Sequence, residues 1–289
     1  MKLLEAVGLS KTYSKERGWF TTQAPAMQAV HNVSLNLAEG ETLGLVGESG
    51  SGKSTLGRLL LGLDKPTSGK VLYRGQDITG LSLKQMRSVR HRMQMVFQNS
   101  LSAFNPRFTV EEIIGEPLRN YREGVAEARR EKVLDSLERV SLSSQYMRRY
   151  PHELSGGQQQ RVGIARAIVL KPELLICDEP FSSLDATLRR QMLNLLLDLK
   201  SQLDLSYVFI THDLSLVDRF CDHVAVMNRG QIVEQQRRDF ILQNAVHPYT
   251  RSLLESVPIQ DPRLRRGAVE SRERRISSLI LNREEEQMI

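Results

Sequence analysis

The chain has only two cysteines, Cys177 and Cys221, and no long apolar run among its 289 residues. Two cysteines cannot form a disulfide framework, and they cannot complete a metal site without other ligands. The longest apolar run, around LLLGL, is far shorter than the roughly 18 residues that a helix needs to cross a bilayer. The N-terminus MKLLEAVGLSKTYS also lacks the apolar segment of a secretory signal. We therefore expect a cytosolic protein in a reducing setting.

The sequence also lacks long-period repeats and long heptad runs, and its 40% hydrophobic and 26% charged residues are ordinary for a soluble globular protein. The formal net charge is +6. Much of the positive charge lies in RLRRGAVESRERR, residues 263–275, where glutamates partly offset the arginines. This segment is either a solvated tail or a surface that lies beside anionic lipid.

Segments of strand character alternate with helical segments along much of the chain. Strands are expected within TLGLVG, ELLICDEP, SYVFITHD and HVAVMNRGQIVE, and a helix within LRRQMLNLLLDLKSQL. Apolar strands that alternate with helices predict an α/β fold whose mainly parallel sheet is covered on both faces. The apolar and polar alternation of MQAVHNVSLNLAEGE adds a small antiparallel β region near the N-terminus.

Two segments interrupt this pattern. Residues 14–28, SKERGWFTTQAPAMQ, are expected to form a surface insertion. Residues from about 89 to 165 are expected to form a mostly helical insert. Its segment VAEARREKVLDSLERVSL repeats apolar residues at the three- and four-residue spacing of an amphipathic helix, at Val133, Leu134, Leu137 and Val140.

The stretch GESGSGKST lies between an expected strand and an expected helix, and it fits the pattern G-x-x-x-x-G-K-[ST] of a phosphate-binding loop. Its glycines allow backbone N–H groups to surround phosphates. Lys53 is expected to reach the β- and γ-phosphates, and the Ser54 hydroxyl to bind Mg²⁺. The ATP-binding residues expected here are Gly47, Glu48, Ser49, Gly50, Ser51, Gly52, Lys53, Ser54 and Thr55.

The stretch LLICDE places two carboxylates at the C-terminal end of an apolar strand, which is where ligands bind in open α/β sheets. We expect Asp178 to hold Mg²⁺ through water, and Glu179 to act as the general base on the attacking water. Two adjacent carboxylates can also lie in a solvated turn, but the preceding strand and the phosphate loop argue against that interpretation.

A second stretch suited to an anion, ELSGGQQQR at 153–161, raises the question of what it binds. A serine and two glycines at the start of a helix present backbone N–H groups to an anion, with no Cβ in the way. Since the phosphate loop already accounts for one triphosphate, we expect this stretch to serve a nucleotide held by a second subunit. ATP is then enclosed between two chains.

These motifs, together with SSLD at 182–185 and ITHD at 210–213, have an order and spacing that resembles the nucleotide-binding subunit of an ABC transporter. The resemblance covers about residues 1–255 and leaves 256–289 as a charged C-terminal extension. It implies a P-loop ATPase core with a helical subdomain, and an enzyme that hydrolyses ATP. It also implies a head-to-tail dimer in which the partner's ATP contacts Ser155, Gly156, Gly157, Gln158 and Asp185.

The resemblance assigns further roles to single residues. Gln98 in MVFQNS matches the Q-loop glutamine, which touches Mg²⁺ and senses the transmembrane subunits. His212 matches the switch histidine that contacts the γ-phosphate. Tyr13 in LSKTYS matches the aromatic residue that stacks on adenine, with Val30 on the same ring face or against the ribose. A tyrosine in the hydrophobic core is the alternative for Tyr13.

Two longer stretches, FQNSLSAFNPRFTVEEIIGEPL and HPYTRSLLESVP, resemble the ATPase subunits of bacterial oligopeptide, dipeptide and nickel importers. This implies a peripheral subunit on the cytoplasmic face of the inner membrane, two transmembrane permeases, an external solute-binding protein and a second ATPase. That ATPase is an identical chain or a paralogue. Residues 100–107 are expected either near the groove that receives a permease helix or as a loop on the helical insert. The cargo is a peptide or, alternatively, nickel or a metal chelate.

Some members of this subfamily bind an iron–sulfur cluster through cysteines in the C-terminal region. No cysteine follows residue 240 in this sequence, so we expect no cluster. The tail, with RRISSLILN, is either a short amphipathic helix or disordered. Two rival functions are an exporter ATPase, against which HPYT argues, and a soluble ABC protein that acts on nucleic acid or ribosomes. Only the basic balance supports the latter, and we expect no nucleic-acid partner.

Overall fold

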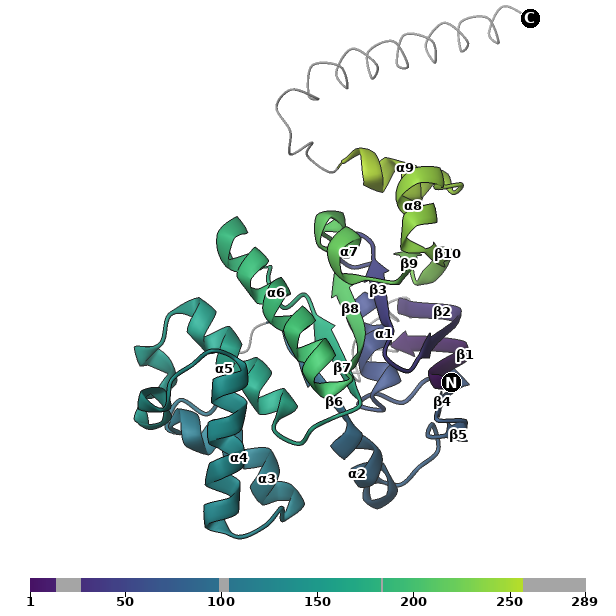
Figure 1. Ribbon diagram of the computed structural model, residues 1–289. Coiled ribbons are helices and arrows are strands. Elements are labelled where there is room, and N and C mark those ends of the chain that lie inside the picture. Colours follow the sequence, from purple (N-terminus) through teal and green to yellow (C-terminus); the bar gives the residue numbers. More distant parts are fainter. Residues whose placement is uncertain (14–26, 99–103, 183, 257–289) are drawn as a thin grey trace, which may run out of the picture.

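The computed structural model describes residues 1–13, 27–98, 104–182 and 184–256, and its centre is a six-stranded sheet (Figure 1). The strand order is β10-β9-β3-β8-β7-β6, and every neighbouring pair is parallel except β9 with β10. The prediction of a mainly parallel sheet is therefore confirmed. The strands are β3 (Thr42–Val46), β6 (Met93–Val96), β7 (Leu174–Asp178), β8 (Ser206–Thr211), β9 (His223–Asn228) and β10 (Gln231–Arg237).

A second sheet contains four antiparallel strands in the order β2-β1-β4-β5. Residues 27 and 28, which the sequence analysis assigned to the insertion 14–28, are paired with the end of β1 instead. They continue the apolar and polar alternation of β2, so the strand begins earlier than expected. Residues 14–26 lie outside the described residues. The strands are β1 (Lys2–Tyr13), β2 (Met27–Ala38), β4 (Ser68–Tyr73) and β5 (Gln76–Asp77).

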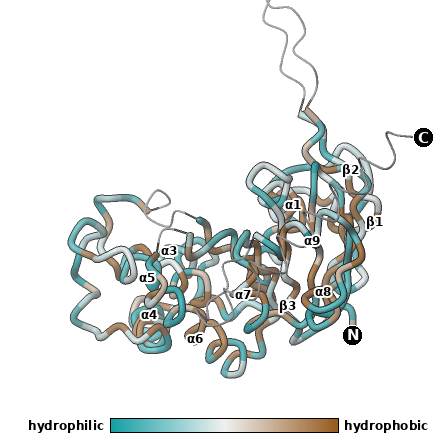
Figure 2. Tube along the Cα trace, turned by 90° about the horizontal axis from the view of Figure 1, so that it is seen from above, coloured by the Kyte–Doolittle hydropathy of each residue, from teal (hydrophilic) through white to brown (hydrophobic). Residues whose placement is uncertain are grey.

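The central strands are buried on both faces. Every residue of β3, β7 and β8 is buried, as expected for apolar strands with helices or a second sheet on each side. One hydrophobic cluster joins α1 (Lys53–Leu60) to the antiparallel sheet, and the other joins α6 (Ala186–Leu203) and α7 (Leu214–Phe220) to the opposite face. Figure 2 shows apolar residues along the chain around β3.

The mostly helical part lies to one side of the sheets (Figures 1 and 2). Its helices pack on one another because Ile113, Val133, Leu137 and Val162 share one hydrophobic cluster. Its helices are α3 (Val110–Tyr121), α4 (Ala126–Arg139), α5 (Gly156–Ile168) and two short 3-10 helices, η2 (Ser144–Arg148) and η3 (Pro151–Glu153).

The predicted start of this insert, near residue 89, differs from the structure. Residues 83–92 form α2 (Leu83–Arg92), but Met93–Val96 form β6, the outer strand of the main sheet, paired with β7. The two ends of β6, Met93 and Val96, are buried, which holds this short apolar segment against the core. The helices of the insert therefore follow β6.

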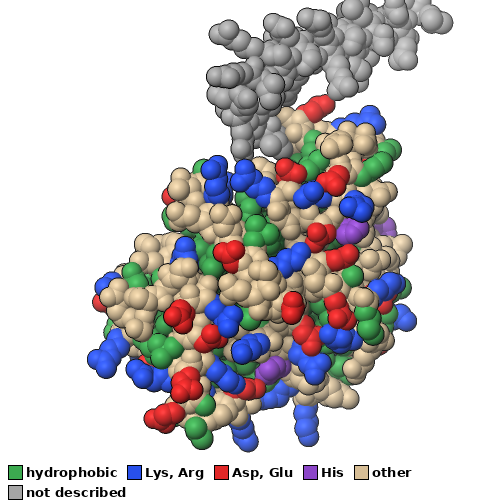
Figure 3. All heavy atoms as spheres, viewed as in Figure 1, with side chains coloured by type: hydrophobic (Ala, Val, Ile, Leu, Met, Phe, Trp, Pro, Cys, Tyr) green, Lys and Arg blue, Asp and Glu red, His purple; other side chains and the backbone are tan. Residues whose placement is uncertain are grey.

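In the described part of the chain after β10, two short helices follow, α8 (Arg238–Asn244) and α9 (Pro248–Glu255). Among the described residues, no helix is both long enough and apolar enough to pass through a membrane. On the face seen in Figure 3, lysines and arginines are interspersed with aspartates and glutamates.

Candidate nucleotide site

The predicted phosphate loop connects the end of β3 to the start of α1, and its backbone requires glycine at two positions. Gly47 has φ +151° and Gly52 has φ +104°. A Cβ on Gly47 would lie 2.1 Å from the carbonyl oxygen of Met227, and one on Gly52 would lie 2.2 Å from that of Ala29. The loop is therefore packed directly on the backbone of β9 and β2, and only glycine fits this close approach.

Lys53, the first residue of α1, is turned back onto this loop. Its ammonium group donates hydrogen bonds to the carbonyl oxygens of Gly47 (2.8 Å) and Glu48 (2.7 Å), and the side chain is 4% exposed. Burial lowers the pKa of Lys53, while the nearby carboxylates of Glu179 and Asp178 oppose that change. The loop thus holds a cation at the place where its backbone N–H groups can surround an anion.

Ser54 and Asp178 meet beside Lys53. The Ser54 hydroxyl donates a 2.9 Å hydrogen bond to Oδ1 of Asp178, which ends β7 and is 8% exposed. Burial raises the pKa of Asp178; the bond from Ser54 and the charge of Lys53 oppose this rise, and the charge of Glu179 adds to it. The structure therefore brings together two of the three predicted Mg²⁺ ligands.

This donor set suits Mg²⁺, because Mg²⁺ prefers hard oxygen ligands and uses one or two protein groups with substrate phosphates and water. Among the described residues, no group of three or more histidine, cysteine, aspartate or glutamate side chains could hold a metal alone. The remaining predicted ligand, Gln98, has its amide nitrogen 3.5 Å from the Ser182 hydroxyl, so it lies beside the segment that follows β7.

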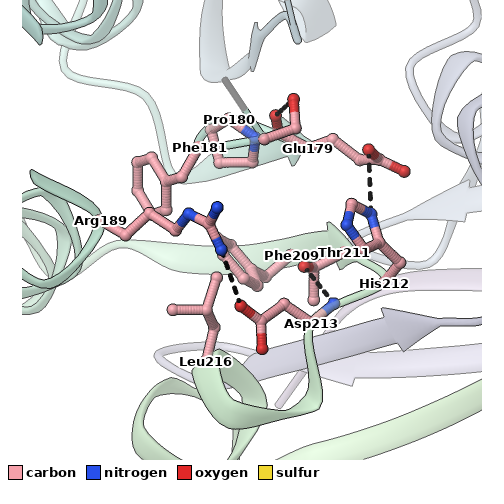
Figure 4. A pocket seen from close by; sticks show the side chains of 10 residues that line it. Glu179, Pro180, Phe181, Arg189, Phe209, Thr211, His212, Asp213 and Leu216 are labelled. Carbon is pink, nitrogen blue, oxygen red and sulfur yellow. Dashed lines mark hydrogen bonds and ion pairs between the residues drawn. The ribbon is translucent and has the colours of Figure 1, made fainter. Parts of the chain in front are cut away.

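Glu179 and His212 face each other across the ends of β7 and β8 (Figure 4). His212 Nδ1 lies 3.2 Å from Oε2 of Glu179, and the two side chains are 56% and 15% exposed. Glu179 has φ +43°, which is uncommon for a residue with a Cβ, and its amide donates to the carbonyl of Ile210. This backbone bond ties the main chain of Glu179, the residue after Asp178, to β8, which leads to His212.

The predicted trans-acting stretch forms the start of α5. Ser155 caps the helix by accepting from the amide of Gln158, whose side chain accepts from the Ser155 amide in return. Among the described residues, the side-chain hydrogen bonds of Ser155 and Gln158 join them to each other and to Tyr146, and none reaches residues 47–55. The structure therefore does not bring this stretch to the phosphate loop of its own chain.

Gly156, Gly157 and Asp185 complete the predicted trans set. No atom lies within 4 Å of a Cβ placed on Gly156, whereas one on Gly157 would touch Leu188 at 3.4 Å. Asp185 caps α6 by accepting from the amides of Thr187 and Leu188, each at 2.9 Å. The exposed Ser155, Gly156 and Asp185 leave polar groups on the surface of the chain.

Comparison with known families decides the identity. The family described as "ABC transporter" matches residues 30–182, and the family described as "Oligopeptide/dipeptide transporter, C-terminal region" matches residues 233–278. The chain belongs to the ABC transporter family. It is an ATP-binding cassette and an ATPase, as the sequence analysis predicted.

Similar curated proteins include a probable peptide ABC transporter ATP-binding protein of Sinorhizobium fredii, with 48% identity over 90% of this cassette and 74% of the relative. The oligopeptide transport ATP-binding protein OppF of Salmonella typhimurium is 46% identical over 92% of this chain and 80% of its own. The dipeptide transport ATP-binding protein DppF of Escherichia coli is 45% identical, with the same coverage of 92% and 80%.

Among solved structures, the dimeric post-hydrolysis state of the ATP-binding cassette MJ0796 bound to ADP and Pi is similar in fold. Its TM-score is 0.73 at 30% identity, over 82% of this cassette and 99% of that chain. The cassette cbiO1 of Clostridium perfringens has a TM-score of 0.72 at 27% identity, over 84% and 91% of the two chains. The predicted ABC ATPase fold is therefore confirmed.

Tyr13 and Val30 differ in their suitability for the adenine ring of ATP. Tyr13 is 42% exposed, its hydroxyl donates to Asp64 at 3.2 Å, and the ammonium of Lys11 lies 5.0 Å from its ring centre. Tyr13 is therefore no core residue. Val30 is 0% exposed and packs within the hydrophobic cluster, and its contact with the nucleotide stays a prediction.

Two contacts of this cassette were not predicted from its sequence. Arg189 of α6 donates to the Leu184 carbonyl and lies 3.4 Å from Oδ2 of Asp213, next to His212 (Figure 4). The Tyr249 hydroxyl accepts a 3.0 Å hydrogen bond from the Glu48 amide of the phosphate loop. The sequence carried no signal for the contacts of Arg189, and its only signal for Tyr249 was the place of that residue in the HPYT motif.

Gly52→Ala tests the packing of the loop. The added methyl group meets the Ala29 carbonyl, so we expect ATPase activity to fall at least about tenfold and the melting temperature to fall. Gly75→Ala, in the turn between β4 and β5, is the matched control, because φ is +77° there but no atom lies within 4 Å of the added Cβ. We expect it to cost about 1–2 kcal/mol of strain at most. Equal effects of the two substitutions would contradict this account.

Proposed function

We propose that this cassette powers a bacterial importer of oligopeptides or dipeptides by binding and hydrolysing ATP at the ends of β3, β7 and β8. The observation that carries the ATP site is the meeting of Lys53, Ser54, Asp178, Glu179 and His212 at adjacent strand ends. In open α/β sheets, ligands bind at this edge.

In this proposal the triphosphate lies along residues 47–55, and the adenine stacks on Tyr13. The Lys53 ammonium exchanges its loop carbonyls for phosphate oxygens, which keeps its charge paired. Ser54, Asp178 and Gln98 are the groups that hold Mg²⁺. When bound, Mg²⁺ neutralises and orients the phosphate oxygens.

Glu179 accepts the proton of the attacking water, and His212 contacts the γ-phosphate. The 3.2 Å separation of their side chains supports this pairing, since a base and its neighbour must lie within reach of one reacting centre. The backbone bond from Glu179 to Ile210 supports it further, because a base that is held in place needs no reorganisation before reaction.

A dimer completes the site. Ser155, Gly156, Gly157, Gln158 and Asp185 contact the nucleotide of a partner cassette, head to tail. Two observations support this. Among the described residues, the side-chain hydrogen bonds of Ser155 and Gln158 do not reach residues 47–55, and Ser155 and Gly156 are exposed at a helix start that can receive an anion. The partner is an identical chain or a paralogous ATPase. The similar cassette MJ0796 is described as a dimer.

The peptide cargo rests on the match of residues 233–278 to the oligopeptide/dipeptide transporter region and on relatives named for peptides. These names favour a peptide over nickel or a metal chelate. The importer has two permeases and an external solute-binding protein, and the cassette lies peripherally on the cytoplasmic face of the inner membrane. Residues 1–255 form the ATPase domain, and residues 256–289 are the charged C-terminal extension, of which 257–289 lie outside the described residues. No iron–sulfur cluster is expected.

Glu179→Gln tests the base. The amide cannot accept the water's proton, so we expect turnover to fall on the order of 10²- to 10⁴-fold while ATP still binds. The variant should accumulate an ATP-bound dimer on size-exclusion chromatography. Glu127→Gln, on the exposed face of α4, is the matched control and should keep wild-type turnover. Near wild-type hydrolysis by Glu179→Gln would refute the assignment.

Co-purification tests the importer. The tagged chain, taken from its native membranes in mild detergent, should bring two permeases and a second ATPase. The peptide-binding protein associated with those permeases would identify the cargo. Recovery with ribosomes or nucleic acid and without any membrane protein would contradict the proposed function but leave the ATP chemistry intact.

A further inference from the structure

The C-terminal region of the chain touches the phosphate loop at one polar contact. Tyr249 is the second residue of α9, and its hydroxyl accepts a 3.0 Å hydrogen bond from the backbone amide of Glu48. The two residues are 201 positions apart in the sequence. Tyr249 also packs against the larger hydrophobic cluster, so its ring is supported from behind.

Glu48, whose amide donates to Tyr249, also binds Lys53 through its carbonyl oxygen. The Glu48 carbonyl accepts from the Lys53 ammonium at 2.7 Å and from the amide of Ser51 at 3.2 Å. Hydrogen bonds on both sides of the Glu48 Cα limit rotation of its φ and ψ angles. The hydrogen bond from the Glu48 amide to Tyr249 therefore helps to set the direction of the Glu48 carbonyl, which accepts from Lys53.

Tyr249 is itself fixed by the start of α9. Glu234 of β10 accepts from the amides of Val246 (2.9 Å) and His247 (3.1 Å). His247 then caps the helix, because its Nδ1 accepts from the amide of Tyr249. The position of Tyr249 is thus set by the Glu234 carboxylate of β10, which binds the segment before α9, and by the His247 imidazole, which caps that helix.

We propose that Tyr249 is a positioning residue of the nucleotide site, which acts through Glu48 to hold the phosphate loop in the form that binds the triphosphate. This inference rests on the proposed role of Lys53 and residues 47–55. The hydrogen bonds of Tyr249 join it to Glu48 and His247 and not to the proposed base Glu179, so in this proposal it sets the affinity for ATP and leaves the chemical step unchanged. The C-terminal region is thereby coupled to nucleotide binding.

Tyr249→Phe removes only the hydroxyl acceptor and keeps the ring. We expect the Kd and the KM for ATP to rise about 2- to 10-fold, as the loss of one hydrogen bond predicts. The kcat at saturating ATP should stay within about twofold of wild type, and the melting temperature should be unchanged, because the ring still packs. Tyr121→Phe, at the end of α3, is the matched control and should change none of these values.

Glu234→Gln supplies a second variant that reaches the same contact from the other side. It weakens the bonds that hold the start of α9, so the KM for ATP should again rise. The double variant Glu234→Gln/Tyr249→Phe should be no worse than the weaker-binding single variant, because both act on one contact. Additive losses, or a KM for Tyr249→Phe equal to that of wild type, would overturn the inference.

Lys53→Ala separates this inference from the proposed site. If Lys53→Ala binds ATP as well as wild type, the proposed site is wrong, and the inference is wrong with it. If Lys53→Ala loses ATP affinity while Tyr249→Phe does not, only the role of Tyr249 is refuted. A fall in kcat and melting temperature of Tyr249→Phe without a change in KM would assign the tyrosine to stability alone.

Discussion

The hydrogen bond between Ser54 and Asp178 is the contact on which the nucleotide site depends. It joins the first turn of α1 to the end of β7, although β3 and β7 are not neighbours, since β8 lies between them. The three strand ends therefore present one continuous row of polar groups: the phosphate loop after β3, His212 after β8, and Asp178 with Glu179 at β7. Parallel strands make this possible because their C-terminal ends meet at one edge.

Burial gives this edge its chemical character. Lys53 and Asp178 are both almost fully buried, and burial disfavours the charged form of each. Each is held by its neighbours: loop carbonyls receive the ammonium, and the Ser54 hydroxyl donates to the carboxylate. Phosphate oxygens and a divalent cation can replace these contacts without leaving a buried charge unpaired. Tight packing of the phosphate loop on the backbone of β2 and β9 fixes the position of the loop relative to Asp178 and Glu179.

Much of the fold and of the site could be predicted from the sequence because the signals are local. The spacing of GESGSGKST fixes a loop between strand and helix, and the position of Asp178 after LLIC fixes its strand end. Other features depend on packing between distant segments. The strand β6 is four residues long, and periodicity cannot distinguish so short an apolar run from part of a helix. The alternation of apolar and polar residues along β2 places Val30 on the apolar face of the strand. The sequence alone does not show that packing of the four-stranded sheet buries this face.

The contacts of Arg189 and Tyr249 illustrate the same limit. Arg189 meets Asp213 across two helix starts, and Tyr249 meets Glu48 across 201 residues. No motif spacing encodes either distance, because each depends on how the later strands and helices return to the loop. The signature stretch at Ser155 could be predicted, yet its purpose depends on a second chain, which a single sequence only implies.

The most direct test of the central claim is the affinity for ATP with and without Mg²⁺, measured by equilibrium titration for wild type and Ser54→Ala. Ser201→Ala, an exposed serine of α6, is the control. If Ser54 and Asp178 hold the metal, Mg²⁺ will tighten ATP binding to wild type and to the control, and will have little effect on Ser54→Ala. A wild-type response to Mg²⁺ in Ser54→Ala would contradict the account.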